Sequence, residues 1–267
     1  MRTIFSEDQL QRYSRQIILK EIGHAGQDKL CKGSVLIIGA GGLGSPAALY
    51  CAAAGIGVIG IADDDTVDLS NLHRQIIHTE AGIGRNKADS AAEAVRRINS
   101  ETTVRLYRER ISASSILSII SGFDFVIDAT DNFPAKFLIN DACVKSRVPF
   151  SHAGVVRFTG QTMTVLPGKS ACFRCVFGSL PPLESVATCS EAGVLGPVAG
   201  VIGTIQATEA IKYITGAGEV LSASFLTYDA LSMKFRKIDL KKNPSCAACG
   251  IDPEKVELKD ETMPAKC

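Results

Sequence analysis

The sequence has almost no net charge and no long unbroken apolar run, and its first residues do not show the pattern of a secretion signal. Its 267 residues include 29 Lys or Arg and 28 Asp or Glu, so no overall field would attract nucleic acid or an anionic membrane. The uncharged stretch Ala192 to Thr208 contains Pro197 and four glycines, which makes it too short and too broken to span a bilayer. The first residues lack the basic-then-apolar layout of a secretion signal. We therefore expect neither nucleic acid nor a membrane among its partners.

Histidine is scarce, whereas cysteine is abundant. The four histidines form no spaced pair of metal ligands, so we interpret them as structural, with His73 and His78 the two that could line a site. Nine cysteines in a large chain without a secretion signal indicate metal binding or thiol chemistry more than disulfides, and they predict a reducing, cytoplasmic compartment. Three of them stand in apolar contexts typical of a core: Cys31, Cys51 and Cys143.

The central pattern is an apolar run over residues 35–38 that leads into a glycine turn and then into a helix opened by Pro46. Gly39 permits the tight turn, Gly41 permits close approach of a phosphate, and Gly44 permits close packing of helix on strand. The helix N-terminus favours negative charge. The pattern predicts a nucleotide-binding loop, and a glycine turn kept only for packing is the alternative.

A second buried strand over residues 58–62 ends at Asp63. Asp63 follows the glycine turn at a spacing of roughly 20 residues. At that spacing this type of fold places the acid that binds the ribose. The alternative interpretation of Asp63 is a simple turn residue. The loop after it, as far as Gln75, is dense in groups that bond to backbone or ligand polar atoms.

The order of the elements predicts an α/β fold with a Rossmann-like, mostly parallel sheet and right-handed crossovers. A capping box begins a helix at Ser6, and later helices are expected over 46–54, 87–98, 135–146 and 198–214. Residues 161–166 and 225–240 are expected to extend the sheet with antiparallel strands. We divide the chain into an N-terminal helical segment (1–30), a nucleotide-binding half (31–155), a sheet extension with a crossover loop and zinc site (156–250) and a flexible tail (251–267).

Three cations and a late carboxylate favour a triphosphate over a dinucleotide: Arg15, Arg74, Lys87 and Asp131. An NAD site would need only one acid and an apolar wall, whereas cations screen phosphate oxygens and a carboxylate can hold Mg²⁺. Each cation taken singly is better explained by a surface salt bridge, because charged residues are mostly exposed, and only the set as a whole favours the triphosphate. The set predicts a nucleoside triphosphate with Mg²⁺ held at Asp131.

Two C-x-x-C pairs predict a structural zinc site with four thiolate ligands: Cys172, Cys175, Cys246 and Cys249. Redox use of one pair is the alternative, although neither pair stands before a thioredoxin-like helix pattern. A further thiol, Cys189, lies in a Pro/Gly-rich crossover over residues 178–196. It is either a nucleophile toward an activated acyl group or an inert thiol.

Taken together, these motifs resemble those of the MoeB/ThiF/HesA family, the bacterial relatives of ubiquitin-activating enzymes. The resemblance covers about residues 5–250. The motifs that carry it are Arg12-Tyr13-Ser14-Arg15-Gln16, Gly39 to Gly44, Asp63-x-Asp65, Ser70 to Gln75, Lys87, Asp128 to Asn132, Cys172-x-x-Cys175, Gly193 to Gly203 and Cys246-x-x-Cys249.

The resemblance implies ATP-dependent adenylylation of the C-terminal Gly-Gly carboxylate of a small ubiquitin-like sulfur-carrier protein, of the thiamine or molybdopterin type, with release of pyrophosphate. It implies a homodimer in which Arg15 reaches the partner's site, a role for Cys189 in sulfur transfer, and a separate protein as sulfur donor. The implied nucleotide contacts are Gly39, Gly41, Gly42, Gly44, Asp63, Asp65, Asn71, Arg74, Gln75, Lys87 and Asp131.

Three other functions stay open. A tRNA-modifying relative would adenylate a small carboxylate, although that group generally lacks the paired C-x-x-C site. An NAD-dependent oxidoreductase would use the glycine loop without the cations. A non-catalytic module would dock a carrier without activating it.

Overall fold

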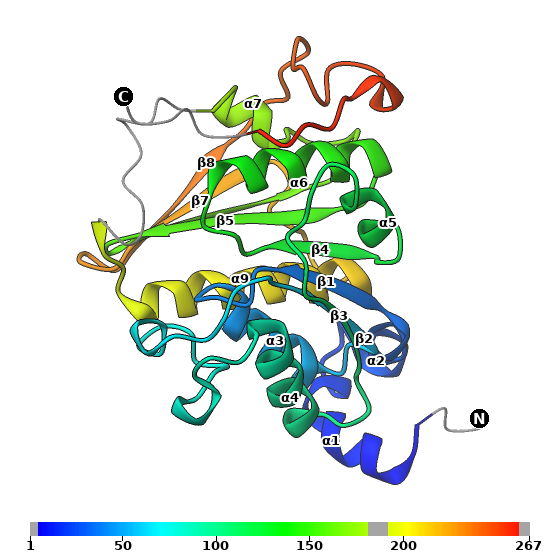
Figure 1. The fold of residues 1–267 in the computed structure, drawn as a ribbon. Helices are drawn as coiled ribbons and strands as arrows, with labels where there is room; N and C mark the ends of the chain where they lie inside the picture. The colour runs from blue at the N-terminus through cyan, green and yellow to red at the C-terminus, as the bar shows by residue number, and fades with distance from the viewer. Residues whose placement is uncertain (1–4, 181–191, 262–267) are drawn as a thin grey trace.

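The computed structural model describes residues 5–180 and 192–261 (Figure 1). The helices are α1 (Glu7–Ile17), α2 (Gly23–Lys32), α3 (Gly44–Ala54), α4 (Lys87–Ile98), α5 (Ile116–Ile120), α6 (Phe133–Ser146), α7 (Phe173–Phe177) and α9 (Gly196–Thr215), with 3-10 turns η1 (Leu69–Asn71), η2 (Glu80–Gly82) and η4 (Pro253–Lys255). The strands are β1 (Ser34–Ile38), β2 (Val58–Ala62), β3 (Thr103–Tyr107), β4 (Phe125–Asp128), β5 (Phe150–Val156), β6 (Thr159–Val165), β7 (Ser224–Asp229) and β8 (Lys234–Asp239).

Within these residues the strands form one eight-stranded sheet in the order β3-β2-β1-β4-β5-β6-β7-β8. Neighbouring strands from β3 through β2, β1 and β4 to β5 pair in parallel. Strands β6, β7 and β8 then continue the sheet in antiparallel pairing. The chain builds outward from β1 to β3 and then returns to place β4 on the other side of β1. The strand order therefore reverses between β1 and β4, and the predicted Rossmann-like fold with an antiparallel extension is confirmed.

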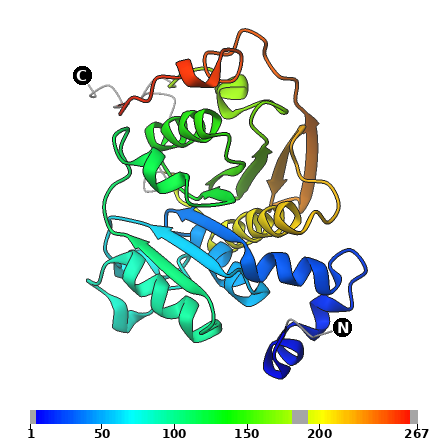
Figure 2. The same ribbon diagram turned by 90° about the vertical axis from the view of Figure 1, so that its right-hand side faces the viewer.

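Helices cover both faces of the sheet. Figure 1 shows α5 and α6 over one face, and α3, α4 and α9 over the other, and the view in Figure 2 agrees. Strands β1 and β4 are almost entirely buried because both of their faces are covered, which explains their continuous apolar runs. The core is accordingly divided into two clusters, one on each side of the sheet.

Helix α9 crosses the middle of the sheet and packs against α3 and β5. Its Gly203 makes the close contact with α3 possible, since a Cβ there would overlap the carbonyl oxygen of Leu43. The helix begins with Pro197 in its first turn and ends at Gly216, which adopts a left-handed conformation. Among the described residues, no helix is both long and apolar enough to cross a bilayer.

The observed helices and strands confirm several of the elements expected from the sequence and add others. The Ser6 capping box is present, with both of its reciprocal hydrogen bonds to Gln9. Residues 225–240 form two strands joined by a tight turn, where the sequence indicated strand structure without locating the turn. Helices α2, α5 and α7 lack a clear sequence signal, because α5 and α7 span only five residues each and α2 starts with a glycine and carries a second one inside.

The C-terminal segment after residue 250, expected to form a flexible tail, contacts α6 over its described part. Val256 is buried, and the Lys145 ammonium donates to the carbonyl oxygens of Glu254 and Val256 at 2.6 and 2.8 Å. Arg174 also bridges the body to the tail by pairing with Asp141 and Glu261. The boundary expected between residues 155 and 156 falls at the end of β5, inside the continuous sheet.

Candidate active site

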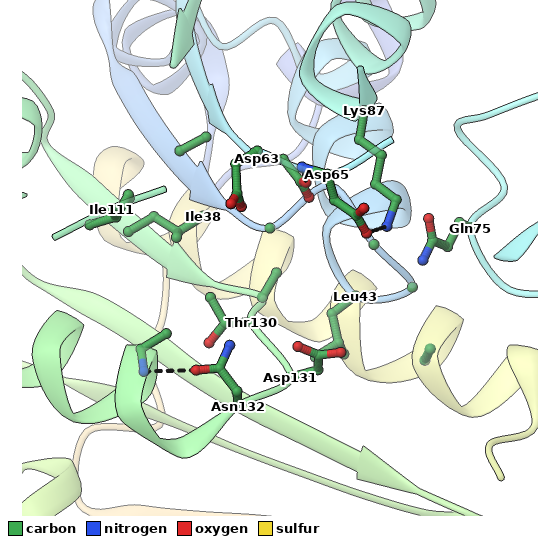
Figure 3. Close-up of a pocket in the computed structure, with 18 of the residues that line it drawn as sticks. Ile38, Leu43, Asp63, Asp65, Gln75, Lys87, Ile111, Thr130, Asp131 and Asn132 are labelled. Atoms are coloured by element: carbon green, nitrogen blue, oxygen red, sulfur yellow. Dashed lines mark hydrogen bonds and ion pairs between the residues drawn. The ribbon is translucent and has the colours of Figure 1, made fainter. Parts of the chain in front are cut away.

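A pocket of about 450 Å³ opens at the carboxyl ends of β1, β2 and β4 (Figure 3). Its walls come from the glycine loop after β1, the acidic segment after β2 and the turn over residues 130–132 after β4. The strand order reverses at this point, which is where open α/β sheets bind their ligands.

Backbone geometry explains the glycines of the loop. Gly39 has a φ of 98°, and a Cβ there would lie 2.7 Å from the carbonyl oxygen of Ala129. A Cβ on Gly44 would overlap the carbonyl oxygen of Gly39, so α3 can approach the strand only because this position has no side chain. Gly41 lines the pocket, and the nearest atom of the described residues to a Cβ there would be Gln75 Nε2 at 3.6 Å. Its backbone is therefore open to a ligand.

Asp63 joins the end of β2 to the glycine loop. Its Oδ2 accepts a hydrogen bond from the Ala40 N–H at 2.7 Å, and its Oδ1 accepts one from the Asp65 N–H at 2.9 Å. Burial raises the pKa of this carboxyl, and the two amides partly offset the effect. Because each carboxylate oxygen has a further lone pair, Asp63 can also accept hydrogen bonds from the hydroxyls of a ligand in the pocket.

Lys87 brings a cation into the pocket from the first turn of α4. The preceding residue, Asn86, caps the helix by accepting hydrogen bonds from the Ala88 and Asp89 amides. The Lys87 ammonium lies 2.5 Å from Asp65 Oδ2, and this hydrogen bond is the largest cause of a lowered pKa at Asp65. A lysine and the positive end of a helix dipole together favour an anionic ligand here.

Two polar side chains reach the pocket from the connection between β2 and α4. Gln75 is only 4% exposed, and its Oε1 has no hydrogen-bond partner among the described residues. Arg74 lies against the Gly42 position and donates to the carbonyl oxygen of Ser70 at 3.1 Å. An unpaired buried acceptor is costly, so the Gln75 amide indicates a donor group on the ligand.

The turn after β4 supplies the opposite wall. Asp131 is exposed in the pocket, and Figure 3 shows it beside Leu43. Asn132 caps α6 by accepting from the Ala135 amide at 2.9 Å. A protein usually holds Mg²⁺ through one or two carboxylates together with waters and substrate phosphates. A single exposed carboxylate facing a phosphate-binding loop fits that pattern.

A network of buried polar and charged side chains holds the turn after β4 in place. Asp128 is 1% exposed; it accepts from Thr130 Oγ1 at 2.6 Å and from His152 Nδ1 at 2.9 Å, and it pairs with Lys136 at 3.3 Å. Burial alone would raise the pKa of Asp128, but the Lys136 charge and the His152 hydrogen bond outweigh it and lower the pKa to about 2. Burial, aided by Lys136, lowers the pKa of His152 to about 4. At neutral pH the network therefore contains one carboxylate, one ammonium and a neutral imidazole.

The structure brings together most of the predicted site residues, although not all of them. The pocket is lined by Gly39, Gly41, Gly42, Asp63, Asp65, Arg74, Gln75, Lys87 and Asp131. Gly44 and Asn71 do not line it, and Arg15 is exposed on α1, outside the pocket wall. Cys189 and the carrier groove expected near it lie outside the described residues.

Sequence reasoning missed part of the wall and its support. The pocket is also lined by Thr130 and by three residues that begin two positions after the end of β3, Glu109, Arg110 and Ile111. Their position at the carboxyl end of a parallel strand was the available signal. The pairing of Lys136 with Asp128 had no such signal, because it depends on how α6 packs against β4.

The four cysteines of the two C-x-x-C pairs meet in one cluster between α7 and the segment after β8. Their sulfur atoms all lie within 4.8 Å of one another, with 3.6 Å between Cys172 and Cys246 and 3.3 Å between Cys175 and Cys249. A tetrahedral zinc ion with Zn–S bonds of about 2.3 Å requires sulfur separations of roughly 3.8 Å. A hydrogen bond from Cys172 lowers the pKa of Cys246, which favours a thiolate in the cluster. The donor set and its spacing fit zinc.

Comparison with known proteins gives consistent results. The model of the ThiF family matches residues 13–248. The adenylyltransferase and sulfurtransferase MOCS3 of Sus scrofa is 45% identical over 256 residues, which are 96% of this chain and 56% of that protein. The SAMP-activating enzyme E1 of Haloferax volcanii is 43% identical over 242 residues, which are 91% of this chain and 89% of that protein. The chain thus spans little more than half the length of the MOCS3 relative.

Solved structures with a similar fold include MccB of E. coli crystallised with ATP. Its TM-score is 0.81 at 26% sequence identity, and the match covers 90% of this chain and 75% of that one.

Proposed function

The chain belongs to the ThiF family, as the sequence motifs implied, and on that premise we propose that its pocket binds ATP and adenylylates a carboxylate. The observation that carries the proposal is the meeting of an open glycine loop, two cations and a carboxylate in one pocket. The cations are Arg74 and Lys87, and the carboxylate is Asp131. A hydride-transfer site would have no use for this set.

The proposed acceptor is the C-terminal Gly-Gly carboxylate of a small ubiquitin-like sulfur carrier, of the molybdopterin or thiamine type. Support comes from relatives whose names describe an adenylyltransferase and sulfurtransferase and a SAMP-activating enzyme. A tail of two glycines has no side chains and can enter a narrow pocket in extended form.

The reaction requires the protein mainly to align the carboxylate with ATP and to neutralise the charge of the phosphates. A carboxylate is ionised at neutral pH, so no general base is needed. Its oxygen attacks the α-phosphorus of ATP, a new C–O–P linkage forms, and the bond to the β-phosphate oxygen breaks to release pyrophosphate. Arg74 and Lys87 neutralise charge that develops on the phosphate oxygens, while the glycine loop orients the nucleotide. A Mg²⁺ ion held by Asp131 would neutralise further phosphate charge.

Other parts of the function are proposed from the family resemblance. Arg15, exposed on α1, would complete the site of a second copy in a homodimer. Cys189 would act in sulfur transfer, a separate protein would donate the sulfur, and the enzyme would work in the cytoplasm.

The test is Mg²⁺-dependent ATP–pyrophosphate exchange with carriers of the thiamine and molybdopterin pathways, each compared with a version lacking its terminal Gly-Gly. Exchange with one intact carrier, and none with its truncated form, is the expected result. Absence of exchange with every carrier would contradict the proposal and favour another acyl substrate or a docking module that binds without turnover.

A further inference from the structure

His78 lies buried directly beneath the glycine loop, in the connection between β2 and α4. Its side chain is 5% exposed and is not part of the pocket wall. Its Nε2 lies 2.9 Å from the carbonyl oxygen of Ala40, and its Nδ1 lies 2.9 Å from the hydroxyl oxygen of Ser90 on α4. The imidazole thus connects the loop to the helix that carries Lys87.

The hydrogen bonds fix the tautomer of this imidazole. Burial lowers the pKa of His78, so the ring is neutral and carries a single proton. The Ala40 carbonyl can only accept, so the proton must be on Nε2. Nδ1 then accepts from the Ser90 hydroxyl. Both ring nitrogens are satisfied only in this arrangement.

The same bonds fix the orientation of the Ala40–Gly41 peptide. The C=O of this peptide is held by His78, and the N–H of the preceding Gly39–Ala40 peptide is held by the Asp63 carboxylate at 2.7 Å, so the backbone is fixed on both sides of Ala40. In a planar trans peptide the C=O and the next N–H point in opposite directions, so the Gly41 N–H points away from His78. Gly41 lines the pocket, and among the described residues its amide donates to no acceptor.

We propose that His78 is a positioning residue for the glycine loop, which holds the Ala40–Gly41 peptide so that the Gly41 amide faces a phosphate of the bound nucleotide. The inference rests on the proposed nucleotide binding. A preoriented amide binds an anion without the cost of reordering the loop. His78 would then contribute to binding of the phosphates and leave binding of the nucleoside unchanged.

The experiment compares ATP with adenosine by calorimetric titration of the full chain. Replacement of His78 by Phe keeps a ring but removes the donor, so ATP affinity is expected to fall by about tenfold or more while adenosine affinity stays within about twofold. His78→Gln places an amide donor near the former Nε2 and is expected to restore most of the ATP affinity. Ser90→Ala removes the hydroxyl that donates to Nδ1, so the ring proton is no longer confined to Nε2. This variant should also weaken ATP binding, by a smaller factor than His78→Phe.

Thr102→Val is the matched control. It removes a buried hydroxyl that donates to the Ile56 carbonyl at 3.0 Å, away from the pocket, so it should leave the ATP affinity unchanged. Equal ATP affinity in wild type, His78→Phe and Ser90→Ala would overturn the inference. Parallel losses for ATP and adenosine would also overturn it, because they would reveal a general packing role. If His78→Phe does not fold, the ATP and adenosine affinities of Ser90→Ala and His78→Gln test the inference in its place. Failure of the wild type to bind ATP would instead refute the proposed function, and this inference with it.

Discussion

The Lys87 ammonium lies 2.5 Å from the Asp65 carboxylate, and the two side chains differ sharply in exposure, at 7% and 66%. The buried cation is therefore held in place by a carboxylate that stands largely in solvent. An exposed partner contributes little to stability and can move away at low cost. This relationship leaves Lys87 available to a phosphate group, which would replace Asp65 as its partner.

Replacement of Lys87 by Met should reduce ATP–pyrophosphate exchange by about 100-fold or more, because the methyl thioether fills the space without supplying charge to the phosphates. The fold should persist, since the Asn86 cap of α4 is untouched. Lys32→Met is the control, because Lys32 also pairs with an aspartate, Asp28, but away from the pocket. Equal exchange in both variants would contradict the role given to Lys87.

Arg74→Ala and Asp131→Ala should each abolish exchange and leave the circular dichroism spectrum unchanged. Arg74 lies on the pocket wall in the connection between β2 and α4, and Asp131 is exposed in the pocket, so neither truncation opens a core cavity. Asn132→Ala serves as comparison, because loss of the α6 cap should cost about 1 kcal/mol of stability. Retained exchange in Asp131→Ala would remove the basis for placing Mg²⁺ there.

Cys172→Ser should release zinc and lower the melting temperature by roughly 5 to 10 °C, since a tetrahedral thiolate site stabilises the segments that it joins. Metal content by mass spectrometry and thermal unfolding provide the readouts. Cys31→Ser is the control, because Cys31 is a half-buried thiol outside the cluster. Unchanged zinc in Cys172→Ser would mean that the four thiols do not form one site.

Two glycines of α9 allow a matched test of the packing between α9 and α3. A Cβ on Gly203 would overlap the Leu43 carbonyl oxygen, whereas a Cβ on Gly200 would meet no atom of the described residues within 4 Å. Gly203→Ala should therefore destabilise the protein by about 2 kcal/mol or more. Gly200→Ala should be neutral or stabilising by up to about 1 kcal/mol, because alanine favours a helix. Urea unfolding measures both, and equal effects would contradict the described contact.

Acid should weaken the fold through His152. Its pKa is lowered to about 4 by burial and Lys136, while in the unfolded chain it is about 6.5. Between these values the unfolded state binds more protons, so the free energy of unfolding falls as the pH drops through this window. The full effect is about 3 kcal/mol. The pKa of Asp128, about 2, adds a loss only below about pH 4.

The measurement is urea unfolding of wild type and His152→Gln at pH 7 and pH 4.5. The variant cannot gain this proton, so its stability should change less with pH than that of the wild type. Acid effects from other groups, His78 among them, occur in both proteins and cancel in the comparison. The same pH dependence in both would contradict the assignment.

Much of the site could be predicted because its residues follow local rules. Gly39 and Gly44 are required by a turn and a helix contact within six positions of each other, and Asp63 follows directly on a buried strand. The two C-x-x-C pairs predicted their cluster because a metal site requires four ligands. The residues after β3 were missed because Glu109 and Arg110 carry no motif of their own and reach the pocket only through the strand order.

The sequence by itself determined most of the element types, the parallel sheet, the glycine loop and the family, since these depend on periodicity and on short, contiguous patterns. Tertiary structure alone decided that His78 contacts the loop, that Lys136 and His152 hold Asp128, and that the Gln75 oxygen has no partner in the described part of the chain. The first two depend on groups from separate elements that come within about 3 Å of each other, and the third depends on the absence of a donor that close among the described residues. Hydrogen bonds and ion pairs act only over such distances, and the distances are set by packing.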